Sequence, residues 1–428
     1  MKSLIKKLAI ASALATASTA FATNGDDLIA IGATARALGG TGIATPQDAI
    51  SAVFANPAAM CFTPGCAYAE VNFDGTLFMP HISAEVDNPA GSFSSDSHSA
   101  VYGIPAIGLS LPLDSVTRRW RFGLAAYGVT GLGVDYRSTV LDQPKFFDFG
   151  PFGKFPLVAG EYTSLQIMKF APAIAYQVTP QLSLGFALHV DYALLDLGHG
   201  SSPAYSVGGQ FGVLYKPIPA LSLGLIYITP QPTVFRHVAD FDGNGTLDKL
   251  TLESPNIVGV GIGYSLYDDR LLFSVDGKWL NWSNADGYSD FDWKDQWVVA
   301  VGVQYAAIPK KLFLRLGYNF GNNPVSAHSG WNGSLATPAP DFVNVQGKMV
   351  PRYYYETFRT IGFPAVVENH ITCGVGYAFS EKFELNIAYM HAFGHDVTEH
   401  GINIAGQPTR IKSTLSEDSV DLGLTWRF

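Results

Sequence analysis

Alternation of apolar and polar residues recurs along most of this chain, and it constrains the fold more than any other feature. From Leu182 to Tyr192 every second residue is large and apolar, and the residues between are mostly small or polar; residues 312–319 repeat the scheme. Beyond the amino terminus no apolar run is long enough for a membrane-spanning helix. The pattern predicts an all-β fold, an antiparallel transmembrane barrel whose strands face lipid on one side and the lumen on the other. About fourteen strands are expected, starting near Ala67, Ala100, Trp120, Leu165, Leu182, Tyr205, Leu221, Asn256, Leu271, Trp297, Leu312, Asn369, Lys382 and Asp418.

The connections between these strands give a second, independent indication. Short turns are expected at residues 112–117, 178–180, 216–219, 268–269, 308–309 and 380–381. Long loops are expected at residues 81–98, 135–163, 231–250, 283–295, 321–368 and 395–417. Short turns at one end and long loops at the other are typical of outer-membrane barrels. A soluble β-sandwich, which the composition alone would allow, has no reason to alternate loop length in this way.

The amino terminus predicts export. Lysines at positions 2, 6 and 7 precede an apolar stretch, and Ala20-Phe21-Ala22 reads as a cleavage site, so residues 1–22 are interpreted as a signal peptide. Residues 23–64 lack alternation and are too few to fold alone, so they should sit inside the barrel formed by residues 65–428. A disulfide between Cys61 and Cys66 is expected across the Pro64-Gly65 turn, with two buried thiols as the alternative. The last residue, Phe428, is the terminal aromatic that the barrel assembly machinery commonly reads.

Two segments of the amino-terminal region resemble the FadL family of outer-membrane transporters. Residues 33–44 read ATARALGGTGIA and residues 48–60 read DAISAVFANPAAM, which includes the hatch motif Asn56, Pro57 and Ala58. The resemblance implies a hatch that plugs a fourteen-stranded barrel, and passive transport of long-chain fatty acids or, in some members, aromatic hydrocarbons. It also implies capture on extracellular loops, a site beside the hatch, and sideways exit through a kink in the third strand. The matching strand, residues 121–133, carries Gly123, Gly128, Gly131 and Gly133, which could instead only relieve crowding in the barrel.

Several residues are candidates for contact with such a ligand. One extracellular loop holds five phenylalanines, Phe146, Phe147, Phe149, Phe152 and Phe155, with Lys145 and Lys154 placed to meet a carboxylate. The alternative is a loop that packs on itself or dips into lipid. The alternation along the strands predicts that further charged side chains point into the lumen. A cation among them could hold the carboxylate of a ligand, or the charges could balance one another. These residues are Lys169, His189, Asp191, Asp276, Lys278 and Arg315, with Arg36 in the hatch.

A possible metal site occurs in another loop. Asp240, Asp242, Asn244, Thr246 and Asp248 follow the spacing of an EF-hand calcium loop, with Gly245 at the tight turn. Thr251 replaces the usual bidentate glutamate, so an ordinary polar turn is the alternative. The prediction is extracellular Ca²⁺ binding, with no other cofactor required.

Other classes of function fit the sequence less well. A net charge of −9 offers no basic stripe for nucleic acid. No phosphate loop or nucleophile elbow is found, and His189 with Asp191, a conceivable pair for a barrel hydrolase, would face a plugged lumen. A general diffusion porin would not need a plug. The sequence therefore predicts a monomeric, non-enzymatic outer-membrane transporter whose partners are lipid and a hydrophobic small molecule.

Overall fold

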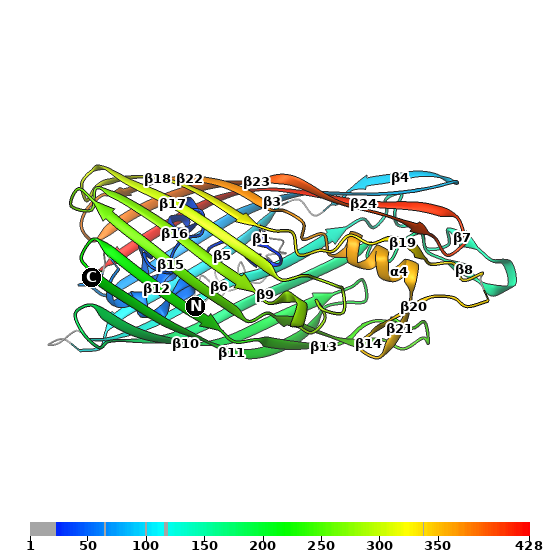
Figure 1. Cartoon of the computed structure of the whole chain (residues 1–428), viewed down its shortest axis with the longest axis horizontal. Helices are drawn as coiled ribbons and strands as arrows, with labels where there is room; N and C mark the ends of the chain where they lie inside the picture. Colours follow the sequence, from blue (N-terminus) through cyan, green and yellow to red (C-terminus); the bar gives the residue numbers. More distant parts are fainter. Residues whose placement is uncertain (1–22, 64–65, 99–100, 115–118, 337) are drawn as a thin grey trace, which may run out of the picture.

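The computed structural model describes residues 23–63, 66–98, 101–114, 119–336 and 338–428, and in these residues fourteen antiparallel strands close into a barrel (Figure 1). Each strand pairs with the next along the chain, and the last pairs with the first from Arg427↔Glu70 to Arg410↔Asp87. The strands are β3 (Glu70–Asn88), β5 (Tyr102–Pro112), β6 (Trp120–Asp135), β9 (Tyr162–Gln177), β10 (Leu182–Asp196), β11 (Ser202–Ile218), β12 (Leu221–Ile228), β15 (Ile257–Leu266), β16 (Leu271–Leu280), β17 (Gln296–Ile308), β18 (Leu312–Gly321), β22 (Asn369–Ala378), β23 (Phe383–Ile402) and β24 (Pro408–Arg427). The predicted fold is confirmed.

Strand parity places the side chains as the sequence indicates. On β10, Leu184 and Leu188 are exposed on the outer face, whereas Ser183, Ala187 and Asp191 are buried inside. The outer face can therefore be apolar along its length while the lumen holds polar groups. None of the helices in the described ranges is long and apolar enough to cross a membrane.

The two ends of the barrel differ as predicted, although two expected loops are in fact strand. The carboxyl terminus lies at the end with short turns, and the longer connections gather at the opposite end (Figure 1). Residues 395–417 were expected to form a loop, but β23 and β24 stay paired up to Ile402↔Pro408. Likewise β3 continues to Asn88 and pairs with β4 (Gly91–Asp96). The outer faces of these extensions are polar, as at Glu85 and Lys412, so they lack the apolar outer face that marks a strand within lipid.

The extracellular connections also hold smaller elements. These are β7 (Phe147–Asp148), η2 (Gly150–Phe152), β8 (Lys154–Phe155), β13 (Gln231–Ala239), β14 (Asp248–Ser254), η3 (Trp282–Asn284), β19 (Ser329–Asn332), β20 (Phe342–Val345), β21 (Lys348–Pro351), α4 (Arg352–Thr357) and η4 (Phe358–Gly362). Strands β13 and β14 pair as a hairpin, so much of the loop expected at residues 231–250 is ordered as strand.

Residues 23–63, called the hatch below, fill much of the lumen. They form β1 (Thr23–Asn24), β2 (Asp27–Leu28), α2 (Ala33–Ala37), α3 (Ala49–Ala55) and η1 (Pro57–Cys61). Wall glycines allow the close approach: a Cβ on Gly185 would lie 2.1 Å from the Ala58 nitrogen, and one on Gly317 would lie 2.1 Å from the Gly39 nitrogen. Residues 1–22 lie outside the described residues, so the signal peptide stays a prediction.

The expected Cys61–Cys66 disulfide is absent from the structure, where both residues are thiols. Cys61 is the last residue of η1 and is buried. Its sulfur lies 3.9 Å from the carbonyl oxygen of Arg119, in the turn between β5 and β6. Residues 64–65, which were expected to make the turn between the cysteines, lie outside the described residues.

Candidate functional site

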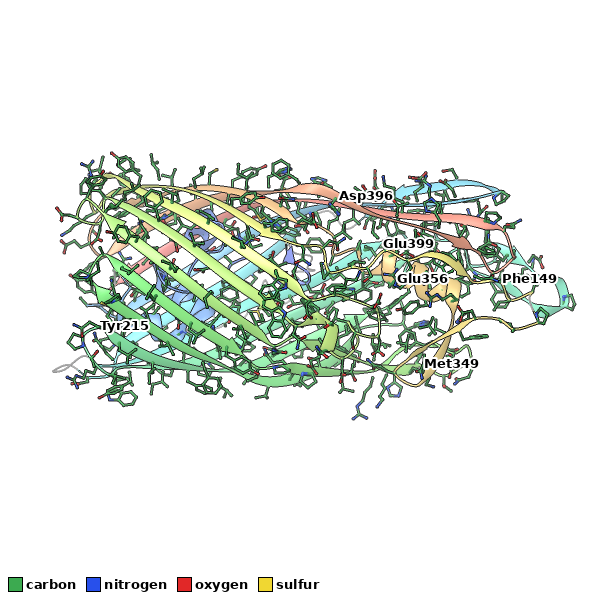
Figure 2. The ribbon with its side chains drawn as sticks, in the orientation of Figure 1. Phe149, Tyr215, Met349, Glu356, Asp396 and Glu399 are labelled. Atoms are coloured by element: carbon green, nitrogen blue, oxygen red, sulfur yellow. The ribbon has the colours of Figure 1, made fainter. Side chains whose placement is uncertain are left out.

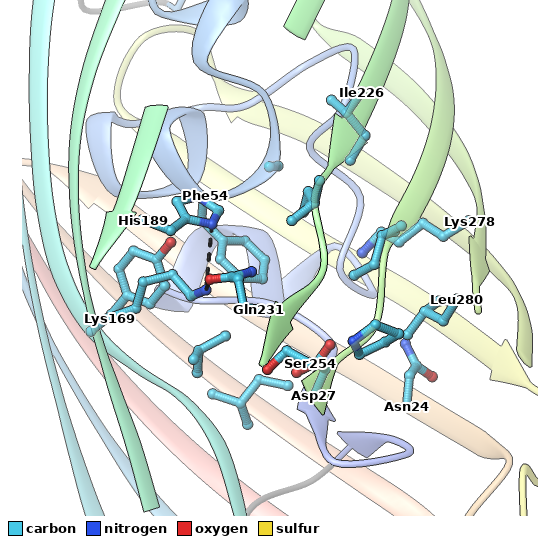
Figure 3. A pocket seen from close by; sticks show the side chains of 17 residues that line it. Asn24, Asp27, Phe54, Lys169, His189, Ile226, Gln231, Ser254, Lys278 and Leu280 are labelled. Carbon is cyan, nitrogen blue, oxygen red and sulfur yellow. Dashed lines mark hydrogen bonds between the residues drawn. The ribbon is translucent and has the colours of Figure 1, made fainter. Parts of the chain in front are cut away.

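A cavity lies between the hatch and the barrel wall, with about 750 Å³ of empty volume (Figure 3). Its lining is mostly apolar and comes from the hatch, from the third barrel strand and from strands on the opposite wall. The apolar lining residues are Leu28, Phe54, Ala55, Tyr127, Val129, Ile226, Ile228, Pro255, Ile257 and Leu280. A concave, mostly apolar site with a few polar groups is the usual form of a small-molecule site.

One of the two cavity lysines has its charge balanced within the wall. Lys169 is buried, and its Nζ lies 3.2 Å from Asp191 Oδ2 and donates to Gln231 Oε1 at 2.6 Å. Its third neighbour is His189 Nδ1, at 3.4 Å (Figure 3). The sequence placed Lys169 in the lumen correctly, but the structure gives its ammonium protein partners.

The other cavity lysine, Lys278, is different. It extends from β16 toward the cavity (Figure 3), and it makes no hydrogen bond or ion pair with any other described residue. The nearby Asp276 carboxylate instead accepts from the Gly42 and Ile43 nitrogens of the hatch, at 2.7 and 2.9 Å. Asp27, which also lines the cavity, accepts from Thr130 Oγ1 at 2.9 Å. Lys278 is therefore a cation in an apolar cavity that is available to a ligand.

The third barrel strand, β6, separates from β5 halfway along its length, although it stays paired with β9 up to Asp135↔Tyr162. Its ladder with β5 runs from Pro112↔Arg121 to Ala106↔Tyr127 and continues no further in the described chain. A bulge against β9 follows between Gly128 and Thr130. Every residue from Tyr127 to Val134 is buried, whereas below this point the outer-face residues Trp120 and Leu124 are exposed. The upper half of β6 thus turns into the lumen, where Thr130 pairs with Asp27 of the hatch, and the wall opens between β5 and β6.

The four glycines of this strand do not share one role. Gly128 borders the bulge, and Gly131 and Gly133 lie in the inward segment. Gly123 lies below it, paired with Ser110, where a Cβ would be 2.5 Å from Met60 Sδ. It permits contact with the hatch and does not contribute to the kink. The sequence alone did not show that Gly123 has a different role from the other three glycines.

No described residue obstructs the lipid side of the opening at Gly103. Gly103 lies on the outer face of β5 in the stretch that has no β6 partner, and a Cβ there would meet nothing within 4 Å. Val101 and Leu77 beside it are 61% and 57% exposed. The opening therefore borders an apolar outer surface.

The five loop phenylalanines do not line the cavity. The ring of Phe147 packs edge-on against Tyr353, with centroids 5.9 Å apart, and Phe146 packs against Phe93 at 5.0 Å. Phe149 and Phe155 pair at 5.7 Å; the side chain of Phe152 lies outside the described ones. The phenylalanines therefore pack partly within the loop and partly against β4 and α4.

The loop lysines are also remote from the cavity. Lys154 Nζ lies 2.8 Å from Asp148 Oδ2 in the same loop, and Lys145 is exposed. Neither residue is part of the cavity lining.

Arg315 and the hatch motif lie on the periplasmic side of the cavity. Arg315 donates to Gln304 Oε1 and Asn386 Oδ1, both at 2.6 Å, and lines an open polar region of about 1900 Å³ together with Glu384 and Arg427.

Asn56 of the hatch motif is buried. Its Nδ2 donates to the carbonyl oxygens of Ile43 at 2.8 Å and Val213 at 3.1 Å, while its Oδ1 accepts from Ala58 N at 3.0 Å. The motif thus fastens the hatch to β11.

The predicted calcium ligands are only partly assembled. Carboxylate oxygens of Asp240, Asp242 and Asp248 lie within 4.8 Å of one another. The ammonium of Lys348 lies 3.0 Å from Asp242 Oδ2 and 2.6 Å from Asp248 Oδ1, so a calcium ion would compete with it. Asn244 Oδ1 accepts from Thr246 N at 2.9 Å. Calcium binding here stays a prediction.

The hatch is held to the far wall by a buried ion pair, which leads to a testable prediction. Arg36 Nε lies 2.8 Å from Asp421 Oδ1, and both side chains are buried. Arg36→Met should leave the Asp421 carboxylate without its cation and cost the docked hatch about 3 kcal/mol. Hydrogen exchange of residues 33–43 should accelerate in the purified variant. The double variant Arg36→Met/Asp421→Asn should recover most of the protection, and unchanged exchange in Arg36→Met would show that the pair does not hold the hatch.

This architecture is similar to that of known outer-membrane transport proteins. Residues 9–220 match the family model described as "Outer membrane protein transport protein (OMPP1/FadL/TodX)". The toluene transporter TodX of Pseudomonas putida aligns with a TM-score of 0.63 at 17% identity, covering 94% of this chain and 99% of its own. A FadL homologue of Pseudomonas aeruginosa aligns with a TM-score of 0.63 at 14% identity, covering 94% and 100%. The toluene transporter TbuX of Ralstonia pickettii gives 0.62 at 16% identity, covering 93% and 98%. No curated protein matches the sequence.

Sequence reasoning missed some of the residues that define the cavity. Parity directed Lys278 inward but could not separate it from Lys169, because the difference lies in their partners. No sequence signal indicated that Asn24, Asp27 and Leu28 at the start of the hatch would line the cavity.

Proposed function

Because the chain belongs to the outer-membrane transport protein family that includes FadL and TodX, we propose that it carries long-chain fatty acids through the outer membrane by passive diffusion. It is an outer-membrane transporter of hydrophobic compounds. The finer assignment to fatty acids rests on the chemistry of the cavity.

The observation that carries this proposal is Lys278. An apolar cavity suits either an acyl chain or a small aromatic ring. An ammonium that has no hydrogen-bond or ion-pair partner among the described residues favours an anionic ligand, because a carboxylate would form a charge-assisted hydrogen bond with it. A neutral hydrocarbon in the same place would displace water from the ammonium and give it no partner.

The polarity of the two ways out of the cavity supports sideways exit. The region beneath the hatch is lined by charged groups, including Arg315, Glu384 and Arg427, and an acyl chain gains nothing by entering it. The opening between β5 and β6 borders lipid-facing apolar residues. A movement of the amino-terminal part of the hatch, whose residues line the cavity, would connect the two. We infer capture at the loops, passage through the cavity and release into the membrane.

Uptake of aromatic hydrocarbons is the alternative function. TodX and TbuX are described as toluene transporters, and the fold is shared with them. We expect the protein to act as a monomer without catalytic activity, and the assembly machinery to recognise the last strand ending at Phe428.

Growth rescue tests the assignment. The gene would be expressed in a Gram-negative host that lacks its own outer-membrane fatty acid channel, with oleate as sole carbon source. We expect growth, and we expect it to disappear when residues 56–58 are deleted while the barrel still assembles. Absence of growth despite a heat-modifiable barrel in the outer membrane would overturn the fatty acid assignment. Uptake of radiolabelled toluene by the same cells would then identify the aromatic alternative.

A further inference from the structure

A partly buried cluster of charged residues lies outside the cavity, among the extracellular loops. At its centre is His328, both of whose ring nitrogens face carboxylates. Nδ1 lies 2.9 Å from Glu356 Oε2, and Nε2 lies 2.8 Å from Asp292 Oδ2. Glu356 is fully buried in α4, so its carboxylate depends on protein partners. This cluster is called the His328 cluster below.

Two arginines and a second buried glutamate complete the His328 cluster. Arg352 Nε and Arg359 Nε each lie 2.7 Å from a Glu356 oxygen. Arg359 also pairs with Glu399, which accepts a hydrogen bond from the backbone nitrogen of His328 at 3.0 Å. The ring of Tyr355 stacks on the imidazole, with centroids 6.5 Å apart.

With all three carboxylates ionised, the charges balance when the histidine is protonated; burial raises the pKa of Glu399 to about 7, so this carboxyl group also takes up a proton as pH falls. The three carboxylates, Asp292, Glu356 and Glu399, face two guanidinium groups, those of Arg352 and Arg359. Imidazolium supplies the third positive charge. The two arginines already occupy the positive positions, so the His328 cluster is a poor site for a metal ion.

The His328 cluster joins segments that are far apart in the sequence. His328, Arg352, Glu356 and Arg359 belong to the connection between β18 and β22, Glu399 belongs to the extracellular extension of β23, and Asp292 belongs to the connection between β16 and β17. Glu356 and Glu399 lie together at the extracellular end of the molecule (Figure 2). A change of charge on His328 acts directly on the contact between the two connections.

The connection that carries Asp292 also contacts the hatch. Tyr288 donates from its hydroxyl to the Asp26 carboxylate, and Trp282 lies so close that a Cβ on Gly25 would be 2.9 Å from its ring. Gly25 and Asp26 lie between Asn24 and Asp27, which line the cavity. Residues 281–295 therefore link the His328 cluster to the hatch segment over the cavity.

We propose that the His328 cluster is a proton-dependent clamp that holds residues 281–295 and the start of the hatch in the closed position, so that loss of the proton speeds uptake. The proposal rests on the transport function proposed above, because its consequence is a change in uptake. The clamp itself is a property of the extracellular loops and can be observed without any substrate.

The proton matters because of the geometry of the imidazole. Neutral imidazole has a single N–H, so it can donate to Glu356 or to Asp292 but not to both. The hydrogen bond to Glu356, with that to Asp292, raises the pKa of His328 above its ordinary value of 6.5 although burial opposes this. A group with a raised pKa stabilises the folded clamp below pH 6.5, and this contribution is lost as pH rises through the raised value. The clamp should therefore loosen above pH 6.5.

The test compares His328→Gln with His395→Gln, a matched control in which a half-exposed histidine lies 3.8 Å from Glu368. Wild-type protein should take up oleate at least about tenfold faster at pH 8.5 than at pH 5.5, the lower end of the size expected from one charge-assisted hydrogen bond. His328→Gln should be fast at both values, and His395→Gln should keep the wild-type profile. A wild-type profile in His328→Gln would overturn the proposal. The proposal would also be overturned if Glu399→Gln abolished the pH dependence of uptake while His328→Gln retained it. The Glu399 carboxyl group would then be the group whose titration controls uptake.

A second measurement separates the clamp from transport. Hydrogen exchange of residues 281–295 in purified protein, corrected for the intrinsic pH dependence, should increase from pH 5.5 to 8.5 in wild type and be high throughout in His328→Gln. This result without any oleate uptake would support the clamp and refute the fatty acid assignment. Exchange in wild type that does not change with pH would refute the clamp whatever the uptake.

Discussion

Replacement of Lys278 by methionine is expected to weaken oleate binding by about ten- to hundredfold and to leave the uptake of toluene unchanged. Lys278 extends toward the cavity and makes no hydrogen bond or ion pair within the described part of the chain, so a bound carboxylate would take its hydrogen bond from this ammonium. Hydrogen bonds to charged groups contribute about 1.5–3 kcal/mol, which corresponds to this range. Methionine preserves most of the length and the apolar part of the side chain, so the shape of the cavity should survive.

Binding would be measured with purified protein by competition against a fluorescent fatty acid, and toluene uptake would be measured in cells. Lys145→Met is the matched control, because Lys145 is an exposed lysine of the phenylalanine-rich loop, away from the cavity. Equal losses for oleate and toluene would mean that Lys278 acts through packing. Unchanged oleate binding would remove the argument for a carboxylate ligand.

Replacement of Gly103 by tryptophan is expected to slow oleate uptake at least about tenfold while oleate binding stays normal. Gly103 lies on the lipid face of β5 where the ladder to β6 is missing, and there is open space around it. A tryptophan side chain would cover about 200 Å² there and obstruct the opening. Since the cavity is on the inner side, its affinity should not change.

Gly277→Trp provides the control for this experiment. Gly277 lies in β16, where the ladders to both neighbouring strands are intact, and the nearest atom to a Cβ there is Val260 Cγ2 at 3.7 Å. Uptake should be normal in this variant. Normal uptake in Gly103→Trp, with the barrel correctly assembled, would mean that the substrate leaves the cavity by another route.

The sequence predicted the barrel well because its main signals are local. The side-chain period of two decides which face of a strand meets lipid, and this held for Leu184 outside and Asp191 inside. The predicted strand ends were wrong where the strands extend beyond the membrane, because an outer face in water need not be apolar. The paired extensions that end at Ile402 and Pro408 are an example. A segment such as the hatch could be placed in the lumen because it has too few apolar residues for a core of its own.

The functional details depended on contacts between residues far apart in the chain. Parity sent both Lys169 and Lys278 inward, but only the fold gave one of them Asp191 and Gln231 as partners. The glycines of β6 look alike in sequence, whereas the kink was located by the end of pairing with β5 at Tyr127 and by the contact of Thr130 with Asp27. The sequence by itself determined a plugged outer-membrane barrel and the face on which each strand residue lies, because these follow from periodicity within single strands. The tertiary structure decided which charge is available, where the wall opens and which loops are fastened together, because pairing energies depend on partners that the linear order does not specify.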